Sequence, residues 1–219
     1  MEKSVIINLT LDEAKELYKS DNEKLRMLAL KIFPEAVLDP PSFTQIRSFE
    51  DAVAILGMNI DDENYTVNTL KERSKASAAM YKLNIIRKAL NLGQDLHLTK
   101  DPEDSYIYYP YNPFVINSST YYGSKINSGE IEIIGKFKCE GEEYNVLNGR
   151  ANDGGYAGLG HFYSSDGVGG ADAPIGYLGC ANKDIAKHFG KYFGMLITES
   201  KYGDMIDFNI IEDKYGCTQ

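Results

Sequence analysis

The sequence has no tryptophan, few cysteines and histidines, and no long apolar run. Its three cysteines, Cys139, Cys180 and Cys217, are widely spaced and form no CxxC pair, which disfavours both a disulfide framework and the usual zinc sites. No stretch approaches the roughly 18–20 apolar residues of a membrane span, and the apolar run near Met1 is too short for a signal-peptide core. We therefore predict a cytoplasmic protein with reduced thiols and no membrane partner.

The standard phosphate-binding and calcium-binding patterns are also missing from the glycine-rich part of the chain. Ten of the 20 glycines lie in residues 149–179, but the stretch contains no GxxxxGK[ST] and no dinucleotide fingerprint that opens a helix after a strand. Asp153, Asp166 and Asp172 could offer oxygen ligands, but the EF-hand pattern is absent. Tight turns are the simplest interpretation, and a loop that closes over a small ligand is the alternative. We predict no cofactor and no metal site.

The chain is acidic, with a formal net charge of −9 over 219 residues. The charge is concentrated in residues 101–219, which carry 9 basic and 17 acidic side chains. An acidic half of this kind repels a phosphate backbone, so a nucleic-acid partner is disfavoured there. A hydrophobic content of 43% is ordinary for a globular protein and is enough to build a core.

Capping signals and apolar periodicity predict a mostly helical part over residues 1–98. Thr10 and Glu13 match a capping box, and Ser48 with Asp51 forms another cap. Residues 61–64 are predicted to be a polar loop. The expected helices cover approximately residues 10–19, 21–33, 48–56 and 74–92.

The sequence of residues 99–219 predicts a β-rich part that contains one long helix, 182–200. Gly190 and Gly194 lie beside the apolar stripe of that helix, which suggests close backbone packing against another element. The overall class is α+β: an N-terminal helical part, then a mixed or antiparallel sheet with a packed C-terminal helix. One core shared by both parts is the alternative to two separate domains. The strands are expected at 105–116 (an edge strand, because of Pro110 and Pro113), 130–139, 143–147 and 204–211.

The candidate ligand site combines a tyrosine-rich segment with the glycine-rich loops. Tyrosines at 106, 108, 109 and 111 partly alternate, so some share one face on which a ring could stack. No residue set makes a convincing catalytic centre, although an enzyme could most simply use Cys180 as nucleophile and His161 as base. We expect a non-catalytic protein that binds a small ligand or a protein partner through Tyr108, Tyr111, Arg150, Asp153, His161 and Asp166.

Residues 71–88 are locally basic and suggest an alternative function. This stretch contains six Lys or Arg residues and a single acidic residue, Glu72. A nucleic-acid-binding regulator would place Lys82, Arg87 and Lys88 against phosphates, whereas a solvated helix face is the simpler interpretation.

Four stretches together carry a resemblance over nearly the whole chain. They are 48–52 with Leu56 and Gly57, 78–91, 108–111, and 175–180 with the helix that follows. On these stretches the chain resembles a family of uncharacterised proteins of gut Bacteroidales and their phages and prophages. The resemblance implies a mobile-element setting and supplies no catalytic residues. We therefore expect a phage- or prophage-associated accessory protein in the host cytoplasm, with a virion or assembly component as the alternative.

Overall fold

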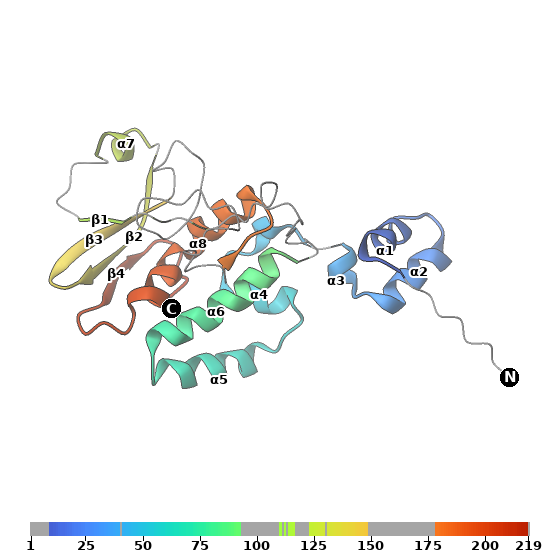
Figure 1. The fold of residues 1–219 in the computed structure, drawn as a ribbon, viewed down its shortest axis with the longest axis horizontal. Helices are drawn as coiled ribbons and strands as arrows, with labels where there is room; N and C mark the ends of the chain where they lie inside the picture. The colour runs from blue at the N-terminus through green and yellow to red at the C-terminus, as the bar shows by residue number, and fades with distance from the viewer. Residues whose placement is uncertain are drawn as a thin grey trace, which may run out of the picture. The chain divides into compact units, whose positions relative to one another are not determined.

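The protein has an α+β fold, and its chain divides into two compact units, Met1–Ser42 and Phe43–Gln219. Figure 1 shows the helices and strands of each unit. The boundary expected near residue 98 lies outside the described residues. No described helix has both the length and the apolarity needed to cross a membrane. The computed structural model describes residues 9–39, 41–92, 110, 112, 114–116, 123–129, 131–148 and 178–218.

The described residues of the N-terminal unit form three helices: α1 (Leu11–Tyr18), α2 (Glu23–Ile32) and α3 (Glu35–Leu38). The predicted capping box is confirmed, because the Glu13 amide donates to the Thr10 hydroxyl and the Glu13 carboxylate accepts from the Thr10 amide at 2.9 Å. These two bonds satisfy amides that the first helical turn leaves unpaired. The core of this unit is formed by Ala14, Ala29 and Leu38, with partly buried neighbours.

The second unit begins with η1 (Phe43–Gln45) and three helices, α4 (Phe49–Ile55), α5 (Ile60–Lys71) and α6 (Lys75–Leu90). The helices over α4 and α6 were predicted, but the polar loop predicted at 61–64 is wrong. Asn59 caps α5, and the acidic residues that suggested a loop occupy its first turn. Negative charge at this end of a helix interacts favourably with the helix dipole and stabilises the helix.

Four antiparallel strands form a sheet in the order β1-β3-β2-β4. As predicted, the segment that contains the prolines supplies an edge strand. The last strand starts later than the predicted 204, because Asp204 caps α6 instead: its carboxylate accepts from the Ser74 hydroxyl at 2.5 Å and from the Ala76 amide at 3.2 Å. The strands are β1 (Phe114–Ile116), β2 (Glu132–Cys139), β3 (Glu142–Asn148) and β4 (Asn209–Asp213), and the short helix α7 (Gly123–Asn127) lies between β1 and β2.

Helix α8 (Lys183–Tyr202) joins the helices to the sheet (Figure 1). Asn182 caps it by accepting from two backbone amides, as the sequence predicted. Its buried face, which includes Phe189, Phe193 and Leu196, belongs to one hydrophobic core with residues of α4, α6 and the sheet. The helices of residues 43–92 and the sheet therefore share a core.

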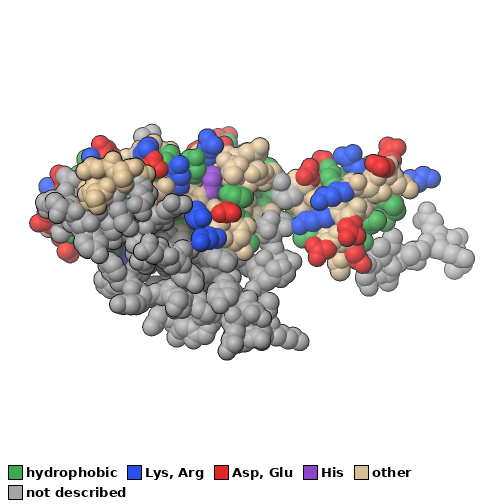
Figure 2. All heavy atoms as spheres, turned by 90° about the horizontal axis from the view of Figure 1, so that it is seen from above, with side chains coloured by type: hydrophobic (Ala, Val, Ile, Leu, Met, Phe, Trp, Pro, Cys, Tyr) green, Lys and Arg blue, Asp and Glu red, His purple; other side chains and the backbone are tan. Residues whose placement is uncertain are grey.

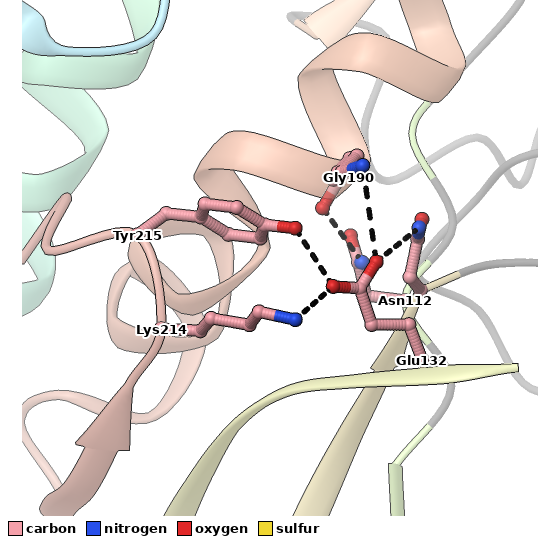
Figure 3. Close-up of polar contacts among 7 residues, drawn as sticks. Asn112, Glu132, Gly190, Lys214 and Tyr215 are labelled. Atoms are coloured by element: carbon pink, nitrogen blue, oxygen red, sulfur yellow. Dashed lines mark hydrogen bonds and ion pairs between the residues drawn. The ribbon is translucent and has the colours of Figure 1, made fainter. Parts of the chain in front are cut away.

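The two glycines of α8 were predicted to permit close packing against another element, and they lie close to Asn112, with Gly194 also close to Ile134 of β2. The Asn112 side-chain amide donates to the Gly190 carbonyl at 2.8 Å (Figure 3). It also donates to the Leu147 carbonyl at 3.2 Å. Asn112 is 1% exposed, and a Cβ at Gly194 would lie 2.7 Å from its amide nitrogen. A side chain at Gly194 would therefore push α8 away from the sheet.

We predict that Gly194→Ala destabilises the protein by about 1–3 kcal/mol, because the new methyl group overlaps Asn112 and Ile134. Gly123→Ala is the matched control, since a Cβ there meets no atom within 4 Å. Chemical denaturation of both variants measures the difference. Equal stability of the two variants would contradict the close approach.

Candidate functional site

Cationic and aromatic side chains from three separate parts of the second unit meet on one surface. Figure 2 shows Lys and Arg side chains gathered around the histidine on this face. We call this surface the Tyr192–Tyr215 patch. Its members are Arg47, Glu132, His188, Lys191, Tyr192, Lys214 and Tyr215.

Helix α8 supplies three members of the patch, each of them partly buried. His188, Lys191 and Tyr192 lie at i, i+3 and i+4, so they are neighbours on the helix surface. The His188 and Tyr192 rings have centroids 4.5 Å apart. The same helix therefore contributes both to the core and to the patch.

The turn after β4 brings Tyr215 against Tyr192, with ring centroids 4.8 Å apart. Asp213 shapes this turn because its carboxylate accepts from the backbone amides of Gly216 and Thr218, each at 3.0 Å. Lys214 is held in the turn by its backbone amide, which donates to the Ile134 carbonyl at 3.0 Å. The turn is therefore tied both to itself and to the sheet.

Arg47 enters the patch from the residue before the Ser48 cap of α4. Its backbone amide donates to the Asp51 carboxylate at 2.9 Å, and its Nε donates to the Thr44 carbonyl at 3.3 Å. The guanidinium carbon lies 5.3 Å from the centroid of the Tyr192 ring, within the range of a cation–π interaction. Among the residues that the structure describes, no carboxylate forms an ion pair with this guanidinium, and Arg47 is exposed.

Glu132 on β2 is the acidic member of the patch (Figure 3). Its carboxylate accepts from the Lys214 ammonium and from the Tyr215 hydroxyl, the latter at 2.9 Å, and lies 3.9 Å from the Lys191 ammonium. Partial burial alone would raise the pKa of Glu132, but these hydrogen bonds and positive charges outweigh it and lower the pKa. Glu132 is therefore a carboxylate at neutral pH and orients both lysines.

His188 lies between the rings of Phe43 and Tyr192 and is half-buried. Its Nε2 is 2.6 Å from the Ile46 carbonyl oxygen, and since a carbonyl can only accept, Nε2 carries the hydrogen. Burial lowers the pKa of His188, and the nearby charges of Arg47 and Lys191 lower it further. The imidazole is therefore neutral at physiological pH.

The patch as a whole is suited to an anion. Lys191 and Lys214 together carry two positive charges against the one negative charge of Glu132. Arg47 adds a third positive charge, over the Tyr192 ring. Lys191 also lies 5.6 Å from the Tyr192 ring centroid and 5.9 Å from that of Tyr215. Cations held over rings keep fewer rotamers than free surface lysines, so less entropy is lost when they bind a carboxylate or phosphate.

The predicted ligand-binding residues are not among those that the structure places. Tyr108, Tyr111, Arg150, Asp153, His161 and Asp166 all lie outside the described residues, and so does most of the glycine-rich stretch. Their role stays a prediction.

The residues of the alternative nucleic-acid site do not form one exposed basic face. Lys82 is only 9% exposed, its ammonium lies 5.6 Å from the Phe49 ring centroid, and burial lowers its pKa. Arg87 is half-buried, and only Lys88 is exposed. A helix that turns Lys82 inward leaves a weaker surface for a phosphate backbone than the sequence suggested.

Cys180 is fully buried, as expected for a packing residue. Its thiol donates to the Leu178 carbonyl at 3.4 Å, and burial raises its pKa to about 12. A thiol of this kind stays protonated at neutral pH and is a poor nucleophile.

Sequence reasoning missed the Tyr192–Tyr215 patch. One signal was present, because His188, Lys191 and Tyr192 lie at helical spacing on the polar side of the predicted helix. The other members come from positions 47, 132 and 214–215, and no local pattern connects them. Comparisons of the chain with protein-family models, with curated proteins and with solved structures found no match.

We predict that His188 makes stability depend on pH. Because its pKa in the fold is below the usual value of about 6.5, the unfolded chain takes up a proton first as the pH falls, and the free energy of unfolding decreases from about pH 7 downward. His188→Gln removes this group and should give a shallower dependence between about pH 7.5 and 5.5. Urea denaturation across this range tests it, and identical pH dependences for the two proteins would show that His188 does not contribute.

Proposed function

We propose that the protein is a non-catalytic accessory protein, associated with phages or prophages, that binds an acidic segment of a protein partner through the Tyr192–Tyr215 patch. The observation that carries the proposal is the guanidinium of Arg47, stacked on Tyr192 and without a carboxylate partner in the described part of the chain, beside two lysines oriented by Glu132. The mobile-element setting rests on the sequence resemblance alone. Binding by the tyrosine-rich and glycine-rich segments remains a separate prediction.

The overall charge favours a short acidic segment over a long polyanion. The chain carries a net charge of −9, so a nucleic acid that extends beyond the patch would be repelled by the rest of the surface. A few carboxylates can contact Arg47, Lys191 and Lys214 without meeting that repulsion. Lys82 is buried, so it offers no surface charge that would support binding of a nucleic acid.

The absence of catalysis is supported by the chemistry of the described cysteines. All three are free and buried, and burial raises the pKa of each, so they are protonated packing residues. Free thiols are typical of proteins of the cytoplasm, which is the location that we propose.

We predict that a short labelled peptide of alternating Asp and Glu binds the protein and that Arg47→Ala weakens binding by about threefold to tenfold. Lys201→Ala is the matched control, because Lys201 also lies over a tyrosine of α8, 5.3 Å from the Tyr202 ring centroid, but outside the patch. Fluorescence anisotropy gives the affinities, and binding should weaken as salt is added.

A neutral peptide of the same length should not bind. If the acidic peptide fails to bind, or if Lys201→Ala reduces binding as much as Arg47→Ala, the patch is not the binding site.

A further inference from the structure

Helix α2 of the N-terminal unit carries an apolar stripe that the described residues of the unit leave partly exposed. Leu25, Leu28 and Ile32 lie at i, i+3 and i+7 and so share one face of the helix. Leu25 is 37% exposed and Ile32 is 43% exposed, and neither belongs to the core of this unit. Figure 2 shows hydrophobic side chains at the surface of this unit among charged ones. We call these three residues the α2 stripe.

The core of the N-terminal unit is small, which makes the α2 stripe significant. Of its three fully buried residues, two are alanines, which bury little area. Units of this size bury too little apolar surface to be very stable alone. Covering the Leu and Ile side chains of the stripe would therefore add to the stability of this unit.

Charge distinguishes between the possible occupants of the α2 stripe. Lys24 and Lys31 are exposed and lie at i−4 and i+3 from Leu28, so both flank the stripe on the same side. Two copies of α2 packed antiparallel about Leu28 would bring Lys24 of one copy against Lys31 of the other, twice. Like charges at these positions disfavour self-association.

We infer that the α2 stripe is a docking surface for an amphipathic helix of another protein whose apolar face is flanked by Asp or Glu. The apolar face of that helix packs on Leu25, Leu28 and Ile32, and its acidic residues pair with Lys24 and Lys31. This is the helix-on-helix mode of peptide recognition, with charge setting the choice of partner. The inference is independent of the Tyr192–Tyr215 patch.

The test uses the full-length protein and two synthetic helical peptides with the same Leu and Ile stripe, one flanked by Glu and one by Lys. Anisotropy should show the Glu-flanked peptide binding at least about tenfold more tightly, with the preference reversed in the Lys24→Glu, Lys31→Glu double variant. This comparison between peptides needs no variant that could unfold.

Two further variants locate the surface. Leu25→Glu should weaken binding of the Glu-flanked peptide by at least about tenfold. Met27→Glu should leave binding within about twofold, because Met27 is 49% exposed on the same helix but lies away from the α2 stripe. Circular dichroism confirms that both variants fold.

The proposal is overturned if neither peptide binds, if the two peptides bind equally, or if Leu25→Glu and Met27→Glu have the same effect. It is also overturned if light scattering shows a dimer of the full-length protein that Leu25→Glu dissociates, since the occupant would then be a second copy.

Discussion

The second unit depends on the close packing of α8 against both the sheet and α6. Large side chains such as Phe189 and Phe193 fill the core, while the glycines at 190 and 194 allow Asn112 to reach the helix backbone. The Asn112 amide links α8 to β3. This link fixes both the rotation of the helix about its own axis and its distance from the sheet. That rotation decides which residues face the solvent, and therefore where His188, Lys191 and Tyr192 are presented.

The proposed site follows from this packing and from local electrostatics within an acidic protein. Glu132 lies on β2, a strand that α8 contacts, and its lowered pKa keeps it charged so that it orients Lys191 and Lys214. Arg47 is instead held by backbone contacts and by the Tyr192 ring. Glu132 thus partly neutralises two of the cations, whereas no described carboxylate pairs with the third. Together with the net charge of the chain, this is the basis for proposing a short acidic segment as the ligand.

Much of the fold could be predicted from the sequence because its helix ends carry strong local signals. Thr10 with Glu13, Ser48 with Asp51, and Asn182 each cap a helix as expected, and the two glycines of α8 make the close contact that their position suggested. Local reasoning was wrong at 61–64, where acidic residues belong to the first turn of a helix. It also gave no sign that Lys82 is buried, as are half of the residues of α6.

The Tyr192–Tyr215 patch could not have been predicted in the same way, because its members are brought together mainly by tertiary packing. His188, Lys191 and Tyr192 are close in sequence, and Lys214 is next to Tyr215, but these two groups, Arg47 and Glu132 are far apart along the chain. Arg47 is positioned by a helix cap, Glu132 by the register of β2, and Tyr215 by a turn that Asp213 organises. Each of these local features is common in proteins, and none by itself indicates a ligand.

The measurement that tests the central claim most directly is a double-mutant cycle between Arg47 and Tyr192. Affinity for the acidic peptide would be measured for Arg47→Ala, Tyr192→Leu and the double variant, with stability determined for each. If the tyrosine ring acts by supporting the guanidinium, the double variant should bind about as weakly as Arg47→Ala alone. Losses of binding free energy that simply add would contradict the account, because the two side chains would then act independently.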